Sequence, residues 1–268
     1  CFFATILGGC TPVLLNPSSP NGELEGLCER AGVQSIIFGP NQVTENRSLD
    51  NVTLFNPYHS SSHGEQLDKI ELVGRIPTDT AFIIFSGGTT GRPTGCLVTH
   101  ENMLSELYAM SEAHALPDDG VHLCMLPMFH ASALFRNLLI PFAQGSKIVI
   151  ARQFDPKQFW NWMEKFRVNF VQTVPSIIRL LLDQDIEPMT AVKNAVDYIG
   201  CASGPLDGTV ARAFETRFGI LVAPAYGATE STCGICFNHP NDARRRLDSP
   251  GRALPNMKLE IRDETGAV

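Results

Sequence analysis

The sequence lacks both a long apolar segment and a strongly basic region. No apolar run approaches the roughly 20 residues that span a bilayer, and no charged segment precedes the first apolar stretch. The net charge is −7, and Arg244-Arg245-Arg246 is the only compact basic run. Because a nucleic-acid partner requires a basic surface, we expect no nucleic-acid binding and a cytoplasmic protein without a membrane span. With 268 residues, 44% of them hydrophobic, the chain is long enough for a large core.

Several familiar site patterns are also missing. The eight cysteines lie mostly in apolar segments, which is typical of buried thiols rather than of a disulfide framework. Cys233 and Cys236 have a zinc-ligand spacing with His239 nearby, but no second pair follows, so two strand thiols are the favoured interpretation. Neither Ser86 nor Ser203 has the flanking glycines of a serine-hydrolase elbow.

The most informative segment is the glycine-rich stretch at 85–95. It contains four glycines, three threonines and a serine, whose backbone N–H groups and hydroxyls suit a loop around phosphate. An apolar run at 81–84 precedes it and predicts a buried strand, and we expect a helix to begin within 97–102. The stretch matches neither the Walker nor the Rossmann pattern, and an ordinary surface turn is the alternative.

Strand and helix patterns alternate along the chain, with a turn-rich boundary at 116–120. The pattern predicts an α/β fold with parallel sheets covered by helices. Expected strands are 34–38, 121–126, 147–150, 168–174, 196–201 and 221–225, and expected helices are 24–31, 131–142, 156–166, 175–182 and 207–218. Ligands of such folds bind beyond the carboxyl ends of the strands, where three motifs are expected to converge.

Those motifs resemble, in order, the segments of the AMP-forming acyl-CoA synthetases of the adenylate-forming superfamily. The glycine-rich stretch resembles their phosphate-binding loop, and Leu126-Pro127-Met128-Phe129-His130 resembles the segment with the active-site histidine. Ser203-Gly204-Pro205-Leu206 is similar to the adenine-contacting turn, and Tyr226-Gly227-Ala228-Thr229-Glu230 to the Tyr-Gly-x-Thr-Glu signature. The run at 239–246 is most similar to crotonobetaine/carnitine-CoA ligases.

The resemblance implies the ligands and the residues that bind them. The ligands are ATP or AMP, Mg²⁺, coenzyme A and a carboxylic acid. The residues expected to bind the nucleotide are Ser86, Gly87, Gly88, Thr89, Thr90, Gly91, Arg92, Thr94, Ser203, Gly204, Pro205, Tyr226, Gly227 and Thr229. Glu230 is expected to bind the metal, Thr229 to contact the α-phosphate, and His130 to orient the acyl carboxylate. A core or capping role is the alternative for His130.

The helix after His130 is expected to line the acyl pocket, although ordinary core packing is nearly as well supported. The apolar side chains concerned are Ala131, Ala133, Leu134, Phe135 and Leu138. Phenylalanines 129, 135 and 237 flank the motifs and would suit the trimethylammonium group of a carnitine-type acid. They would equally suit the aliphatic chain of a fatty-acid substrate.

The phosphate loop departs from the family pattern in two places. Thr94 stands where the family has lysine, and Gly87 where it usually has serine. No lysine occurs between Lys69 and Lys147, so Arg92 is the only cationic side chain in the loop. Triphosphate binding would therefore depend on backbone N–H groups, hydroxyls and metal, and a non-catalytic adenine-nucleotide-binding module is the competing interpretation.

The resemblance also suggests an arrangement of subdomains. It implies a first α/β subdomain at 1–119, a second at 120–237, and the start of a small β-barrel at 238–268, with a barrel strand and turn near 259–266. The family's ribose-binding aspartate and its C-terminal domain with the catalytic lysine have no counterpart here. We therefore expect the 268-residue chain alone to complete no thioester synthesis.

Overall fold

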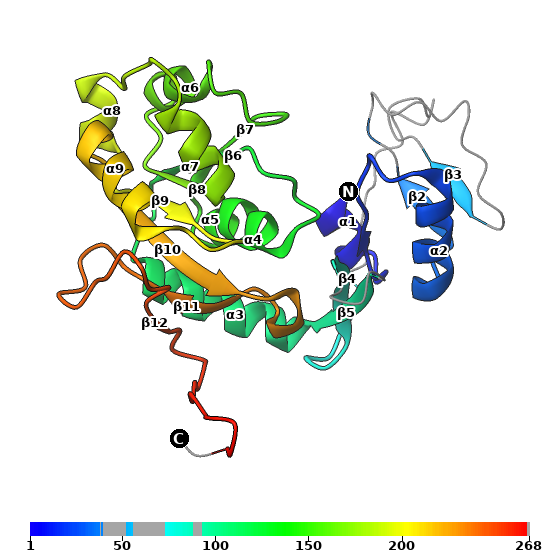
Figure 1. Ribbon diagram of the computed structural model, residues 1–268. Helices are drawn as coiled ribbons and strands as arrows, with labels where there is room; N and C mark the ends of the chain where they lie inside the picture. Colours follow the sequence, from blue (N-terminus) through cyan, green and yellow to red (C-terminus); the bar gives the residue numbers. More distant parts are fainter. Residues whose placement is uncertain (38, 40–51, 56–72, 88–92, 267–268) are drawn as a thin grey trace. The chain divides into compact units, whose positions relative to one another are not determined.

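The computed structural model describes residues 1–37, 39, 52–55, 73–87 and 93–266 (Figure 1). It divides the chain into two compact units, residues 1–103 and 104–268. The middle of the glycine-rich stretch, Gly88 to Arg92, lies outside the described residues, as does Phe38 at the end of one expected strand.

In its described residues, the first unit contains two short helices and two small sheets. The helices are α1 (Phe2–Leu7) and α2 (Asn21–Ala31). The strands are β1 (Val13–Leu14), β2 (Ser35–Ile37), β3 (Thr53–Phe55), β4 (Thr80–Ser86) and β5 (Thr94–Thr99). One sheet has the order β1-β4-β5, with β1 parallel and β5 antiparallel to β4; β2 and β3 form a parallel pair. Strand β4 is central and its Ala81, Phe82 and Ile84 are buried, as the apolar run predicts.

The glycine-rich stretch connects two antiparallel strands, and the second of these strands was not predicted. The helix expected to begin within 97–102 begins at His100, as predicted. Residues 97–99 belong to β5, where Leu97 is paired with Ile83 and Thr94 with Ser86. Helix α3 (His100–His114) begins immediately afterwards. Its start is fixed by reciprocal bonds: the Asn102 N–H donates to Thr99 Oγ1 at 3.1 Å, and the Thr99 N–H donates to Asn102 Oδ1 at 3.4 Å.

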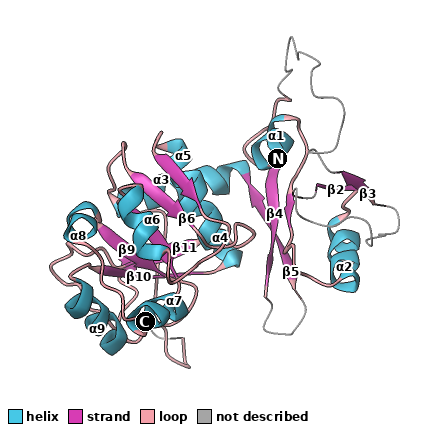
Figure 2. Ribbon diagram, turned by 90° about the horizontal axis from the view of Figure 1, so that it is seen from above, coloured by secondary structure: helices cyan, strands magenta, loops and turns pink. Residues whose placement is uncertain are grey.

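The second unit is built on a seven-stranded sheet of order β12-β11-β10-β9-β8-β6-β7 (Figure 2). The strands are β6 (Val121–Cys124), β7 (Lys147–Ile150), β8 (Phe170–Thr173), β9 (Tyr198–Cys201), β10 (Val222–Gly227), β11 (Gly234–Phe237) and β12 (Arg252–Ala253). Strands β10, β9, β8, β6 and β7 are each parallel to the adjacent strand in this order. Strand β11 is antiparallel to β10, and β12 is antiparallel to β11. The predicted α/β fold is thus confirmed.

The helices of this unit follow the predicted alternation. They are α4 (Ala131–Leu134), the π-helical turn η1 (Phe135–Leu139), α5 (Ile140–Ala143), α6 (Phe159–Lys165), α7 (Pro175–Leu182), α8 (Thr190–Ala195), α9 (Gly208–Phe218) and the 3₁₀ turn η2 (Thr229–Ser231). Strand β7 and helix α7 have the expected bounds. Helix α9 begins one residue late because Asp207 caps it, accepting from the Thr209 N–H at 2.7 Å.

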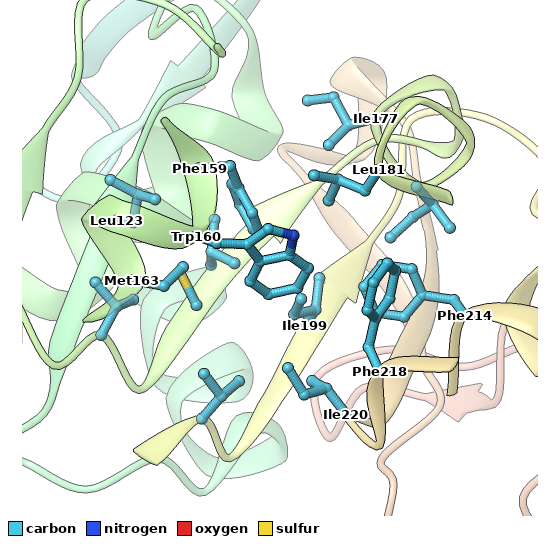
Figure 3. Close-up of a cluster of buried hydrophobic side chains, with 14 of the residues drawn as sticks. Leu123, Phe159, Trp160, Met163, Ile177, Leu181, Ile199, Phe214, Phe218 and Ile220 are labelled. Carbon is cyan, nitrogen blue, oxygen red and sulfur yellow. The ribbon is translucent and has the colours of Figure 1, made fainter. Parts of the chain in front are cut away.

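A large apolar core packs helices against one face of this sheet (Figure 3). Alternate strand residues such as Leu123 and Ile199 point into it, together with Trp160 and Phe218, whose ring centroids are 5.1 Å apart. Each fully buried side chain of this kind contributes about 1.5–3 kcal/mol. The core therefore fixes the ends of β9 and β10, where the candidate site lies.

Residues 238–266 contain only β12 as regular structure. Residues 259–262, expected as a barrel strand, are irregular, because no partner strand lies beside them in the described chain. The basic run forms ion pairs: Arg245 pairs with Glu215 of α9, and Arg246 with Asp248 at 2.9 Å. Among the described residues, no helix is both long and apolar enough to cross a membrane.

Candidate functional site

A cavity of about 490 Å³ lies in the second unit at the carboxyl ends of β9 and β10. It brings together Ser203, residues 226–229 and His130, which are far apart in the sequence. Of the three motifs expected to converge at the carboxyl ends of the strands, the Ser203 turn and the Tyr226 segment therefore meet at this cavity, together with the His130 segment. Gly204 and Pro205 follow Ser203 but do not line the cavity.

Ser203 enters the cavity from a strained turn. Its φ is 66°, in the left-handed region that a residue with a Cβ adopts at a cost of about 1–3 kcal/mol. The preceding strand fixes this position, because the Ala202 N–H donates to the Thr173 carbonyl at 3.2 Å. The strained turn places Ser203 at the wall of the cavity.

Tyr226 and Gly227 form the end of β10. The side chain of Tyr226 is exposed (53%), so one face of its ring is accessible for stacking on a planar ligand. Gly227 faces the backbone across a bulge in the β10–β11 pairing. A Cβ at this position would lie 1.8 Å from the Cys233 carbonyl oxygen, so only glycine fits.

Thr229 and Glu230 lie in the 3₁₀ turn that follows. Ser231 Oγ donates to the Ala228 carbonyl at 2.9 Å and holds this turn closed. Thr229 lines the cavity, and Glu230 is exposed at the next position, outside the lining residues. No cluster of three or more His, Cys, Asp or Glu side chains occurs in the described chain. One accessible carboxylate fits Mg²⁺, which commonly binds one or two carboxylates together with phosphates and water.

His130 lines the cavity from the position preceding α4. Its side chain makes no capping bond, and its ring centroid is 4.3 Å from that of Phe129. Desolvation at the cavity wall lowers the pKa of His130, so the imidazole is neutral at pH 7 and accepts or donates hydrogen bonds without a charge.

The helix after His130 lines the cavity with different residues from those expected. Ala131 and Ala133 contact it, as predicted, together with Ser132 and Arg136. Leu134, Phe135 and Leu138 are not among the lining side chains. Ordinary helical spacing explains the difference, because these three side chains lie on the opposite side of the helix from Ser132, Ala133 and Arg136. Leu134 and Phe135 are fully buried there, as the core-packing alternative expects.

The described ends of the phosphate loop, Ser86, Gly87 and Thr94, belong to the first unit. Ser86 is buried, and its Oγ has no hydrogen-bond partner among the described residues. Gly87 and Thr94 are exposed, and nothing lies within 4 Å of a Cβ built on Gly87. An unpaired buried hydroxyl beside an open glycine fits a loop that binds an acceptor such as phosphate.

Replacing Thr94 with lysine should tighten ATP binding, because it adds an ammonium group to the phosphate loop. We expect a gain of about 1 kcal/mol, roughly fivefold in Kd, that declines as salt is added. AMP lacks the distal phosphates and should gain much less. Calorimetry with both nucleotides measures the difference, and Thr216→Lys on exposed α9 is the matched control. Equal gains for AMP and ATP would contradict a position of Thr94 near the β- and γ-phosphates.

Sequence reasoning missed the charged residue of the cavity, Arg136. It lines the cavity from η1 although only 2% of its surface is exposed. Its signal in the sequence was a polar pair, Arg136-Asn137, inside an otherwise apolar helix pattern. Cys233 also lines the cavity, and burial raises the pKa of its thiol to about 12, so the thiol stays protonated at neutral pH.

Comparison with known proteins agrees with the fold and the motifs. The family model described as AMP-binding enzyme matches residues 1–268, and the chain therefore belongs to this family of adenylate-forming enzymes. Crotonobetaine/carnitine–CoA ligase of Salmonella paratyphi B is 32% identical over 189 residues, which are 69% of this chain and 35% of that protein. The ligase of the same name from Citrobacter koseri is 33% identical over 189 residues, which are again 69% of this chain and 35% of that protein.

Solved structures of adenylate-forming enzymes share the fold. ATP-bound MatB from Rhodopseudomonas palustris matches 99% of this chain and 54% of its own, with a TM-score of 0.84 and 25% identity. The O-succinylbenzoate coenzyme A synthetase MenE from Bacillus subtilis, in complex with ATP and magnesium, matches 100% of this chain and 55% of its own, with a TM-score of 0.84 and 21% identity. The chain thus spans about a third of the curated relatives and about half of these structures.

Proposed function

We propose that the protein is an acid–thiol ligase, which activates a carboxylic acid as acyl-AMP with ATP and transfers the acyl group to coenzyme A. The observation that carries the proposal is the cavity in which His130, Ser203 and Thr229 come together from three separate segments. These are positions at which the family resemblance expects the acyl carboxylate, the adenine and the α-phosphate.

The first half-reaction joins the acid to the nucleotide. A carboxylate oxygen of the acid attacks the α-phosphorus of ATP, and the bond to pyrophosphate breaks. Tyr226 stacks on the adenine, while Thr229 donates to an α-phosphate oxygen and so stabilises the charge that develops there. Bound Mg²⁺, held by Glu230, would supply positive charge beside the phosphates.

The second half-reaction transfers the acyl group. The thiol sulfur of coenzyme A attacks the carbonyl carbon of acyl-AMP, and AMP leaves. In the preceding step, His130 lines the cavity as a neutral imidazole. It orients the acyl carboxylate through hydrogen bonding and not through a full positive charge. Ser86 and the ends of the glycine-rich loop hold the distal phosphates before pyrophosphate departs.

Among carboxylic acids, we propose a short polar acid rather than a long-chain fatty acid. A buried cation on the cavity wall disfavours a long aliphatic chain, because an apolar group beside it offers its positive charge no compensation. The named relatives at 32% and 33% identity make crotonobetaine and carnitine candidate acids.

A panel of acids tests this proposal with the protein at its full encoded length. With ATP, Mg²⁺ and coenzyme A, we expect at least one short polar acid to form a coenzyme A thioester at 10-fold or more the kcat/KM of palmitate, a margin of about 1.4 kcal/mol. Thioester formation from palmitate alone would contradict the substrate preference. Nucleotide binding without a thioester from any acid would favour the non-catalytic module that the loss of the loop lysine at Thr94 suggests.

A further inference from the structure

Arg136 is a buried cation at the wall of the acyl cavity with part of its hydrogen-bonding capacity unused. A guanidinium has five N–H donors. Nη1 lies 2.8 Å from His114 Nε2 and 3.5 Å from Gln172 Oε1, and the side chain also bonds to Cys233. Nε has no hydrogen-bond partner among the described residues. An unmet buried donor costs about 1–3 kcal/mol, which adds to the cost of burying this cation.

His114 contacts Arg136 but does not neutralise it. The Tyr198 hydroxyl donates its single proton to the His114 carbonyl at 3.0 Å, so His114 Nδ1, 2.8 Å away, must donate to the hydroxyl oxygen. Nε2 is then the acceptor for Arg136. Burial, reinforced by the charge of Arg136, holds the pKa of His114 well below its ordinary value, in agreement with a neutral ring.

The nearest buried carboxylate, Glu106, is engaged elsewhere. Its Oε1 accepts from the Gly234 N–H at 2.5 Å, and its Oε2 accepts from Asn256 at 3.5 Å. In the described parts of the chain, Arg136 forms no ion pair within 4.0 Å, although the two opposite charges attract each other at longer range. A buried cation without a direct counter-ion is costly, and an anionic ligand would remove that cost.

The ring of Phe237, which could have bound the trimethylammonium group of a carnitine-type acid, is already in contact with other side chains. The guanidinium carbon of Arg136 lies 5.6 Å from the ring centroid of Phe237, and the His114 ring stacks on the same phenylalanine at 4.2 Å. A trimethylammonium group placed there would meet a like charge in a low-dielectric environment. Phe237 itself does not line the cavity, whereas Arg136 does, so the wall that Arg136 forms suits an anion and not a cation.

We infer that Arg136 is a specificity-determining residue, and that the acid activated at this site carries a second anionic group, as a short dicarboxylic acid does. The inference rests on the proposed ligase function, and among short polar acids it favours diacids over the cationic crotonobetaine and carnitine. One carboxylate is presented to ATP near His130, and the other lies against Arg136 at the cavity wall, where its charge offsets that of the buried guanidinium. A monocarboxylic acid of equal length leaves that positive charge without a counter-ion.

Matched acids test the inference on the protein at its full encoded length. The pairs are succinate and butyrate, glutarate and valerate, and adipate and hexanoate, with crotonobetaine as the cationic probe. We expect the wild type to favour the diacid by at least about 10-fold in kcat/KM in one pair, chiefly through KM. Arg136→Met should reduce that ratio to about 1 or below, and Arg136→Lys should give an intermediate ratio. Arg212→Gln, an exposed arginine of α9, should leave it unchanged.

The possible outcomes separate this inference from the ligase function. Thioester formation that favours the monoacid of every pair, or crotonobetaine over every diacid, would overturn the inference and leave the ligase function intact. An active Arg136→Met variant with the wild-type ratio would assign Arg136 a purely structural role and also overturn it. If Arg136→Met does not fold, the inference is tested by two other results: the diacid preference of the wild type and the intermediate preference expected of Arg136→Lys. No thioester from any acid would overturn the ligase function, and the inference with it.

Discussion

Replacing Glu230 with glutamine should reduce acid-dependent exchange of pyrophosphate into ATP by about 100-fold or more while the protein stays folded. The amide keeps the shape of the side chain but gives a bound Mg²⁺ no charge. Loss of one such electrostatic contact in a transition state costs about 3 kcal/mol. Because the Glu230 side chain is exposed in the turn after β10, the substitution leaves the apolar core intact.

The matched control for this prediction is Glu112→Gln. Glu112 is an exposed glutamate of α3, so the same chemical change there should leave exchange within a factor of two of wild type. Exchange by Glu230→Gln within that factor at saturating magnesium would exclude Glu230 as the metal ligand.

Replacing Gly227 with alanine should lower the free energy of unfolding of the second unit by about 3 kcal/mol or more. The added Cβ would lie 1.8 Å from the Cys233 carbonyl oxygen and 2.8 Å from the carbonyl carbon, and both are backbone atoms that cannot rotate away. Overpacking of this kind typically costs about 1–3 kcal/mol, and a backbone clash belongs at the upper end. Because the clash separates β10 from β11, nucleotide binding should weaken as well.

Urea unfolding followed by tryptophan fluorescence measures this effect. Both tryptophans, Trp160 and Trp162, lie in α6 of the second unit, so the signal reports that unit. Gly204→Ala is the control, because its Cβ would meet nothing closer than 3.6 Å, and its stability should stay within about 0.5 kcal/mol. A stability of Gly227→Ala within that same range would show that the β10–β11 bulge accommodates a side chain.

Regular elements with strong local signals were predictable from sequence. Helix α7 has its expected bounds because Pro175 stands at its first position and apolar residues recur at helical spacing. Strand β7 is a short apolar run bounded by a turn. The β5 strand was missed because only three of its six residues are apolar, Cys96 to Val98, and so short a run does not distinguish a strand from a helix start. Pairing with β4 decides between them.

The polar part of the cavity wall could not be predicted, because distant segments assemble it. Arg136, His114 and Tyr198 meet on the sheet face opposite the large apolar core, and this depends on the register of β9 and on the packing of η1 against β6 and β8. Local periodicity contains neither. The motif residues at 203 and 226–229 were identified because each follows a predicted strand, and parallel strands bring their carboxyl ends to one edge.

The most direct test of the ligase assignment is isotope exchange between pyrophosphate and ATP by the protein at its full encoded length, with and without acid. Adenylation predicts exchange that requires both the acid and Mg²⁺, and formation of AMP, not ADP, when coenzyme A is added. Exchange that is absent with every acid, or acid-dependent release of ADP and phosphate, would contradict the assignment.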